Sequence, residues 1–160
     1  GILFVDEAYS LVQSQGDSFG REAVDTLVAE IENNRKNLVV IFAGYSKDMD
    51  EFFRNNQGLR SRVPVELIFE DYSEEELFDI CNNMLAAKNY HLENEMAKAK
   101  LRALIRDKAV RVDFGNARGV RNLVDNIIRK QNVRLAAALQ ENASQVTNEM
   151  LTMITFQDIA

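Results

Sequence analysis

The stretch GILFVDEA, residues 1–8, decides the fold, because an apolar run ends in two adjacent carboxylates. A run with no polar break predicts a strand covered on both faces, as in the parallel sheet of an α/β protein. Such sheets bind ligands at the carboxyl ends of their strands, where Asp6 and Glu7 stand. A native domain seldom begins on a central strand, so we expect residue 1 to be a cut inside a larger domain.

The next segments repeat the α/β pattern. Apolar residues recur at helical spacing over residues 20–35, and residues 38–43 form a second apolar run. Strand, helix and strand in this order predict a βαβ crossover with parallel strands. A short helix over residues 49–54, a turn at 55–58 and a third strand at 65–69 complete this part.

From residue 71 the pattern becomes helical. Ser73 and Glu76 form a capping box, which predicts the start of a helix. Apolar faces at helical spacing predict two more helices, over residues 94–110 and 117–139. The fold class we expect is α/β plus all-α: residues 1–70 as the C-terminal part of a parallel-sheet domain, and residues 71–160 as a small helical bundle.

Composition excludes several classes of protein. The 160 residues are 46% hydrophobic and 28% charged, which excludes general disorder. A net charge of −6 argues against wholesale coating of nucleic acid, and no apolar run is long enough to span a bilayer. One cysteine, Cys81, and one histidine, His91, exclude an internal disulfide and a His/Cys zinc cluster. We therefore expect a cytoplasmic protein without a membrane partner.

Asp6 and Glu7 carry the strongest chemical signal. Two carboxylates at a strand end are costly unless a cation or a reaction uses them. In nucleotide hydrolases such an Asp holds Mg²⁺, and a following Glu polarises the attacking water. The alternative is a helix N-terminus, where the dipole favours acidic residues without any catalytic role.

Arginines form the second chemical pattern. The segment GLRSR, residues 58–62, places Arg60 and Arg62 on a short turn, where guanidinium groups can bind a phosphate. The segment GNAR, residues 115–118, places Arg118 in the first turn of a helix, against the helix dipole. An anionic partner would justify a cation there, whereas each arginine alone fits an ordinary solvated surface residue.

Together these motifs resemble the AAA+ ATPases. The segments VDEA at 5–8, FAGY at 42–45, GLRSR at 58–62 and GNARGVRN at 115–122 follow the order of that family. They are especially similar to the branch that contains red-type Rubisco activase and stage V sporulation protein K. The resemblance covers essentially all 160 residues and implies an ATPase core followed by a helical lid.

The resemblance also implies roles for single residues. Asp6 and Glu7 match the Walker B pair, that is, the magnesium site and the catalytic glutamate. Tyr45 falls at the sensor 1 position, where many members carry Asn. Arg62 matches the arginine finger that acts on ATP of a neighbouring subunit, and Arg60 would assist it. Arg118 matches sensor 2, which reaches the phosphates from the lid; residues 13–21 fall where a second pore loop is placed.

The family's function follows as an expectation. The resemblance implies Mg²⁺ and ATP as cofactors, a homo-oligomeric ring (a hexamer) and a protein client that ATP hydrolysis remodels. The phosphate-binding motif Gly-x-x-x-x-Gly-Lys-[Ser/Thr] does not occur in these 160 residues, which contain no Gly-Lys pair. Without that cradle tight ATP binding should fail, so we expect this segment alone to be inactive.

Three other functions stay open at this stage. The segment GDSFG, residues 16–20, fits the nucleophile elbow of a serine hydrolase, with His91 as the base that Ser18 would need. A non-catalytic adaptor of the same shape is the second. The third is a nucleic-acid-binding helical domain, whose phosphate contacts would come from the basic stretch that includes Lys98, Lys100, Arg102, Arg106, Lys108 and Arg111.

Overall fold

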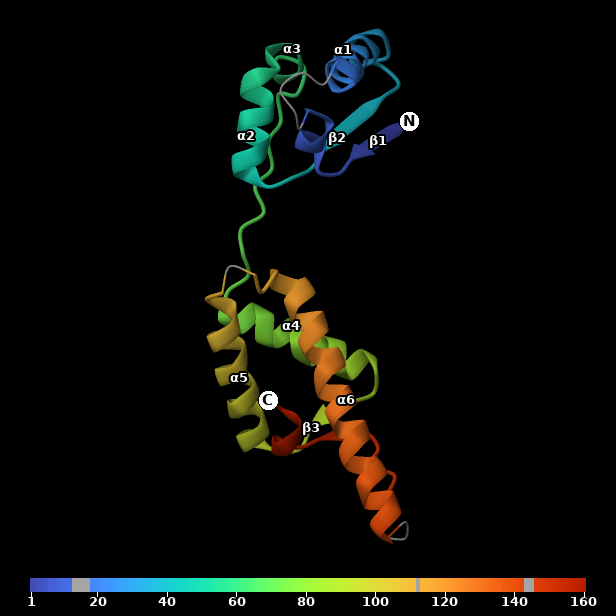
Figure 1. Cartoon of the computed structure of the whole chain (residues 1–160), viewed down its shortest axis with the longest axis vertical. Coiled ribbons are helices and arrows are strands. Elements are labelled where there is room, and N and C mark those ends of the chain that lie inside the picture. Colours follow the sequence, from blue (N-terminus) through green and yellow to red (C-terminus); the bar gives the residue numbers. More distant parts are fainter. Residues whose placement is uncertain (13–17, 112, 143–145) are drawn as a thin grey trace. The chain divides into compact units, whose positions relative to one another are not determined.

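The computed structural model describes residues 1–12, 18–111, 113–142 and 146–160. The chain forms two compact units, Gly1–Phe69 and Glu70–Ala160 (Figure 1). The first holds a parallel strand pair with helices, and the second is a helical bundle. Each unit is described by itself below.

A βαβ crossover organises the first unit. Strand β1 (Ile2–Val5) pairs in parallel with β2 (Val39–Phe42), from Ile2 opposite Val39 to Val5 opposite Phe42. Helix α1 (Ser18–Asn33) makes the connection between the two strands. The predicted parallel crossover is confirmed, and both strands end at the same edge of the sheet.

Helices and an aromatic cluster build the core of this unit. The short helix η1 (Ala8–Val12), α2 (Ser46–Asn55) and α3 (Gln57–Arg60) follow the strand ends. Phe52 is buried and packs at 5.4 Å between ring centroids against Phe53, which meets Phe42 edge-on. These contacts anchor α2 against the end of β2.

Two expectations for this unit are wrong in detail. Residues 57 and 58 of the turn expected at 55–58 already belong to α3, because the Asn56 carbonyl accepts hydrogen bonds from the backbone N–H groups of Leu59 and Arg60. The strands are not covered on both faces: Ile2 is 75% exposed and Phe4 59% exposed. Within the described residues this sheet has two strands, and the helical core packs on Val5 and Phe42 at their ends.

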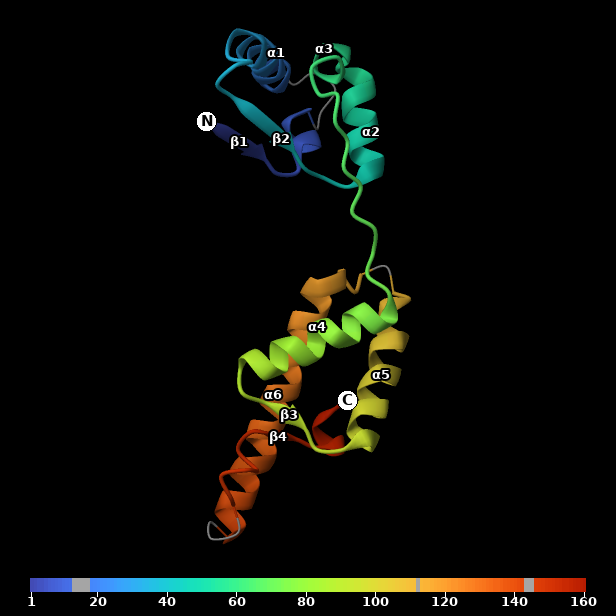
Figure 2. The same ribbon diagram turned by 180° about the vertical axis from the view of Figure 1, so that it is seen from behind.

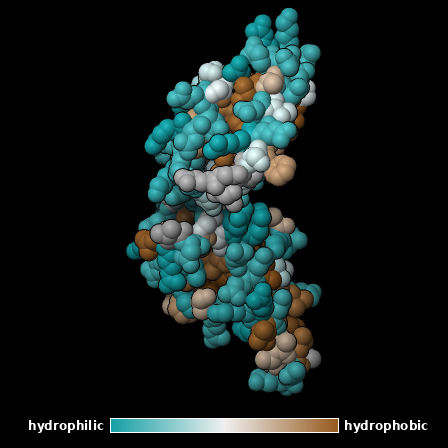
Figure 3. Space-filling model, turned by 45° about the horizontal axis from the view of Figure 1, so that its top comes forward, coloured by the Kyte–Doolittle hydropathy of each residue, from teal (hydrophilic) through white to brown (hydrophobic). Residues whose placement is uncertain are grey.

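The predicted third strand does not form either. Residues 63–72 carry no helix or strand, and Val65, Leu67 and Phe69 are 70%, 76% and 91% exposed. A strand needs a neighbour for its backbone N–H and C=O groups, and no described strand pairs with this segment. The apolar side chains of this segment consequently reach the surface. The chain exposes apolar residues at several places, and Figure 3 shows brown areas on one face.

Three α-helices dominate the described part of the second unit, as predicted. They are α4 (Glu74–Ala87), α5 (Glu95–Ala109) and α6 (Asn116–Asn142), and α4 packs on both of the others (Figure 1, Figure 2). The Ser73–Glu76 capping box is present at the start of α4. Apolar residues at helical spacing meet in one core, including Leu77, Leu85, Leu101, Ile105, Val124 and Ile127.

Cys81 belongs to this core. Its side chain is fully buried, and burial raises the pKa of the thiol to about 12. A thiol with that pKa stays protonated at neutral pH, so the residue packs as a small apolar group, as its place on the apolar helix face predicts.

A small parallel ladder closes the bundle. Strand β3 (His91–Leu92) pairs with β4 (Met153–Ile154), and the short helix η3 (Phe156–Asp158) follows. His91 therefore lies in a strand. Strands of this length carry no periodicity that a sequence pattern can reveal.

One buried ion pair holds the C-terminal segment on α6. Arg134 donates hydrogen bonds to both carboxylate oxygens of Asp158, each over 2.9 Å, and Asp158 is 2% exposed. Burial opposes ionisation of Asp158, yet the hydrogen bonds from Arg134 and Thr155 outweigh it and hold its pKa below the usual value. The carboxylate thus stays charged inside the bundle.

This pair yields a stability prediction. Arg134→Met leaves a buried carboxylate unpaired and should lower the free energy of unfolding by about 3 kcal/mol at neutral pH. Because the folded pKa of Asp158 is depressed, its stabilising effect is present above its unfolded pKa and is lost as pH falls through the folded value. Urea unfolding followed by helical circular dichroism should therefore show the two proteins converging in acid.

The control for this experiment is Arg121→Met, on the exposed side of the same helix. That variant should change stability by less than about 0.5 kcal/mol at neutral pH. Equal losses in both variants would contradict the role given to the buried pair.

Candidate functional site

The residues that follow β1 and β2 lie at the same edge of the sheet. The backbone N–H of Ala43 donates to the Val5 carbonyl over 2.9 Å, and that of Ala8 donates to the Ala43 carbonyl over 3.1 Å. These bonds continue the ladder past the ends of β1 and β2. Asp6, Glu7 and Tyr45 therefore emerge together at the carboxyl edge.

Glu7 adopts an uncommon backbone conformation at this edge. Its φ is +47°, in the left-handed region that costs a non-glycine residue roughly 1 kcal/mol. The Glu7 N–H donates to Asp6 Oδ1 over 3.0 Å, and the Glu7 carbonyl accepts from the Ser10 N–H over 2.7 Å. The sharp turn ends the strand and leaves both carboxylates exposed to solvent.

Tyr9 lies beside these carboxylates and was not singled out from the sequence. Its pKa is raised, first by burial and then by the negative charges of Glu7 and Asp48, with Tyr45 and Asp6 contributing as well. The phenol therefore stays protonated and can donate a hydrogen bond to an acceptor at this edge. Its position in η1, two residues after Glu7, is the sequence signal that could have indicated it.

Gly44 provides the space that Tyr9 occupies. A Cβ at this position would lie 2.7 Å from Tyr9 Cε1 and 2.8 Å from Met49 Sδ. Such contacts are far inside van der Waals distance, so a side chain here would push the Tyr9 ring away. The glycine in the segment FAGY therefore has a packing reason at the edge that carries Asp6 and Glu7.

Tyr45 joins the same edge from β2. It is the N-cap residue of α2, has an extended backbone and is 71% exposed. Its side chain does not cap the helix, so its hydroxyl is open to solvent rather than bound to the helix end.

Arg60 and Arg62 lie elsewhere in the first unit. Arg62 Nη1 donates to the Gly58 carbonyl over 3.1 Å, and Arg62 Nε stands 3.3 Å from Glu32 Oε2 at the end of α1. Arg60 is exposed, 3.4 Å from Glu66 Oε2 and with its guanidinium over the Phe53 ring. Since α1 leads the chain back to the start of β2, the Glu32–Arg62 pair stands toward the opposite edge from Asp6.

Arg118 belongs to the second unit, where it lies in the first turn of α6 and is exposed. The preceding residues Gly115 and Asn116 have φ values of +76° and +55°. A Cβ on Gly119 would lie 2.0 Å from the Phe114 carbonyl oxygen, so only glycine fits there. Within the described ranges no hydrogen bond or ion pair holds the Arg118 guanidinium.

Comparison with known proteins gives these sites a family. Residues 1–71 match the model for the ATPase family associated with various cellular activities (AAA), and residues 73–160 match the AAA lid domain. The chain belongs to the AAA family of ATPases. In family terms its fold is an α/β ATPase part followed by a helical lid, as predicted.

Curated relatives match most of this AAA chain. Protein CbbX of Cereibacter sphaeroides is 44% identical over 86% of the chain and 45% of its own length. Stage V sporulation protein K of Bacillus subtilis is 41% identical over 84% of the chain and 42% of its own length. ESX-1 secretion system protein EccA1 of Mycobacterium tuberculosis is 43% identical over 87% of the chain and 26% of its own length. The chain thus spans less than half of each of these relatives.

The carboxylates of this AAA chain fit a magnesium site in which the protein supplies only one or two ligands. The part of the chain that the structure describes contains no group of three or more His, Cys, Asp or Glu side chains arranged to hold a metal. Mg²⁺ typically keeps several waters and needs only one or two carboxylates when phosphates supply other ligands. The exposed Asp6, with one oxygen bound to the Glu7 N–H, fits that limited role.

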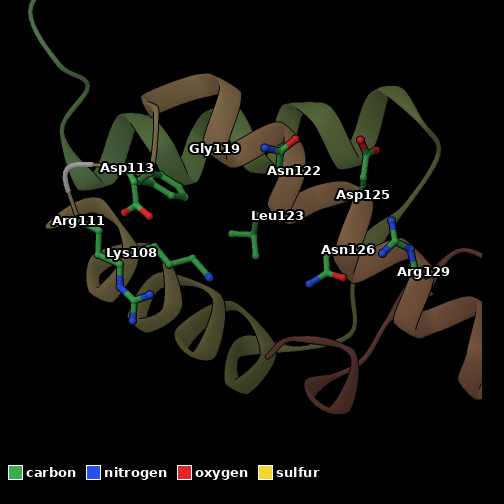
Figure 4. A pocket seen from close by; sticks show the side chains of 10 residues that line it. Lys108, Arg111, Asp113, Gly119, Asn122, Leu123, Asp125, Asn126 and Arg129 are labelled. Carbon is green, nitrogen blue, oxygen red and sulfur yellow. The ribbon is translucent and has the colours of Figure 1, made fainter.

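The lid of the AAA chain contains an open cavity of about 480 Å³. It lies between the end of α5 and α6, with Leu123 at its base and Lys108, Arg111 and Arg129 around it (Figure 4). Asp113 and Asp125 balance part of that positive charge, and Lys88 forms an ion pair with Asp125 over 2.9 Å. Arg118 is not among its lining residues.

The structure adds little support for the serine hydrolase or the nucleic-acid-binding domain considered from the sequence. Residues 16 and 17 of the proposed nucleophile elbow (16–20) and most of the pore-loop segment (13–21) lie outside the described residues. Ser18 begins α1 in one unit, while His91 lies in the other. On α5, carboxylates engage basic residues of the stretch proposed to bind nucleic acid: Lys98 with Glu95, Arg102 with Glu75 and Arg106 with Glu74. No described helix is long and apolar enough to cross a membrane.

The glycine at the sheet edge yields a second prediction. Gly44→Ala should displace Tyr9 and lower the free energy of unfolding by about 2 kcal/mol. Gly58→Ala is the matched control, because a Cβ there would meet Val28 at an ordinary 3.6 Å. Urea unfolding monitored by tyrosine fluorescence measures both. Equal stability of the two variants would show that Tyr9 does not pack against Gly44 as described.

Proposed function

We propose that this chain is part of a ring-forming, cytoplasmic ATPase that remodels a protein client. It would supply the sheet edge at which ATP is hydrolysed, the arginine that acts on a neighbouring subunit's nucleotide, and the lid. Residues 1–70 would end the ATPase core and residues 71–160 would form the lid. The observation that carries the proposal is the joint emergence of Asp6, Glu7 and Tyr45 at the carboxyl edge of a parallel strand pair. Membership of an ATPase family supports it.

At that edge the acidic pair divides two tasks. Asp6 would hold the magnesium that accompanies ATP, and that ion would neutralise phosphate charge during hydrolysis. Glu7, exposed and turned out of the strand by its positive φ, would accept a proton from the attacking water. Tyr45 would contact the phosphates from β2 in the place where many family members use Asn.

The arginines would act from outside this edge. Arg62 is held by the Gly58 carbonyl and Glu32 on the side of the unit away from Asp6, which favours action on a nucleotide of a neighbouring subunit, assisted by Arg60. Arg118, exposed at the start of α6, would reach the phosphates from the lid and couple nucleotide state to lid motion. A hexamer is the ring we propose.

We further propose that the 160 residues alone do not turn over ATP. They contain no Gly-Lys pair and hence no phosphate-binding loop with its lysine. The complete protein that contains this segment is therefore the right material for the assays below, and the segment alone is their negative control.

Glu7→Gln tests the hydrolytic role. In the complete protein this change keeps the size of the side chain and removes its basicity, so ATP turnover should fall by about a hundredfold or more. Nucleotide binding should persist, because Glu7 is proposed to act on water rather than on ATP. Phosphate release and titration with a fluorescent ATP analogue measure the two quantities.

Glu22→Gln, an exposed glutamate on α1, is the control and should leave turnover unchanged. Undiminished turnover in Glu7→Gln would remove the hydrolytic role from this edge. A complete protein that binds ATP without any turnover would instead support the non-catalytic adaptor.

Subunit mixing tests the site of action of Arg62. Glu7→Gln and Arg62→Ala proteins should each be inactive as pure rings. If Arg62 acts on the neighbour's nucleotide, a one-to-one mixture recovers about a quarter of the normal sites, those that combine an intact Glu7 with a neighbouring intact Arg62 in a head-to-tail ring. A mixture that stays inactive after subunit exchange would place Arg62 in its own subunit's site.

A further inference from the structure

Asn116, the first residue of α6, connects two distant segments of the lid unit. Its Oδ1 accepts a hydrogen bond from the Tyr72 backbone N–H over 3.1 Å, and its Nδ2 donates to Asp71 Oδ1. The partners stand 44 and 45 residues earlier in the chain. A single amide side chain therefore links the start of the lid unit to the start of α6.

The linked segment is the place where the chain enters the lid. The lid unit begins at Glu70, and α4 is capped at Ser73, so residues 70–72 form the joining segment ahead of the first helix. This segment has no helix or strand of its own. The Asn116 amide and the Ser73 cap thus mark where the chain becomes part of the folded lid.

Asparagine suits this position in two ways. The backbone of residue 116 has a φ of +55°, a region that Asn and Gly occupy far more readily than other residues. The side chain also donates to a carboxylate and accepts from a backbone N–H, and an amide does this with two separate atoms, Nδ2 and Oδ1. Glycine would satisfy the backbone alone, and aspartate would lose the donor and face Asp71 with a like charge.

The same residue stands two positions before Arg118. Gly115 and Asn116 both have positive φ values, and Gly119 packs against Phe114, so the backbone around Arg118 is tightly defined. No described side chain holds the Arg118 guanidinium, so its direction depends on how this first turn is fixed. The link from Asn116 to Asp71 and Tyr72 adds long-range hydrogen bonds to that turn.

We propose that Asn116 is a positioning residue for Arg118. Its amide binds the joining segment, residues 70–72, to the first turn of α6, and this contact sets the direction in which Arg118 points. This inference rests on the proposed function, in which Arg118 reaches the phosphates of ATP. A helix whose first turn is loose presents Arg118 over a range of directions, and fewer of them reach the phosphates.

The first test measures the link without any catalysis. Hydrogen exchange of the Tyr72 amide in the 160-residue chain should become roughly tenfold faster in Asn116→Ala, because its hydrogen-bond acceptor is gone. Asn126→Ala, an exposed asparagine on the same helix, is the control and should leave that exchange unchanged. Equal Tyr72 exchange in all three proteins would overturn the proposal.

The second test exchanges the partners. Asn116→Asp alone places a carboxylate against Asp71, and in the complete protein kcat/KM for ATP should fall roughly tenfold. In the double variant Asp71→Asn/Asn116→Asp the amide and the carboxylate change places, so both hydrogen bonds can form again with the same net charge. Recovery to within about twofold of the original kcat/KM is expected, and failure to recover would overturn the proposal.

The third test asks whether Asn116 acts through Arg118. In a protein that already carries Arg118→Ala, adding Asn116→Ala should lower kcat/KM by less than about twofold. If the two residues acted independently, the fold-losses of the two single variants would multiply in the double variant. Multiplying effects would overturn the positioning role. Absence of turnover in the unsubstituted complete protein would refute the proposed function instead, and the Tyr72 exchange would still report whether the link exists.

Discussion

The pairing of Val5 with Phe42 at the end of the parallel strands is the constraint on which the candidate site depends. Because both strands stop there, Asp6 and Glu7 leave the sheet beside Ala43, Gly44 and Tyr45. The positive φ of Glu7 then turns the chain into η1, and Gly44 leaves room for Tyr9. One short ladder thus places carboxylates, a protonated phenol and a second tyrosine on one edge, which is what a parallel sheet offers to a ligand.

The lid depends on a different kind of constraint. Its three helices bury a continuous apolar core, but its defining polar contacts join parts that are distant in the chain: Arg134 with Asp158, and Asn116 with Asp71 and Tyr72. Burial makes the first contact a matter of stability, whereas the second lies at the surface, where it fixes direction more than it adds stability. The proposed coupling of Arg118 to nucleotide uses the second.

The sequence predicted those parts of the fold that depend on residues close together in the chain. The βαβ crossover, the Ser73 cap and the apolar helix faces follow from nearest neighbours and periodicity, and all are present. Prediction failed where an element needs a distant partner. Residues 65–69 have the composition of a strand, but no described strand lies beside them. The two-residue ladder at His91 was missed because strands of that length have no periodicity to detect. Asp6 and Glu7 were predicted from their place after an apolar strand, and Tyr45 was predicted from the family resemblance. Tyr9 and Asn116, in contrast, make contacts that only the folded chain reveals.

The most direct test of the central claim is a structure of the complete Glu7→Gln protein with Mg²⁺ and ATP bound. The account predicts the γ-phosphate at the carboxyl edge of β1, with the Asp6 carboxylate facing the magnesium and the substituted residue 7 facing the water in line for attack. Nucleotide bound away from this edge, with Asp6 facing solvent, would contradict the assignment of this edge as the site of hydrolysis.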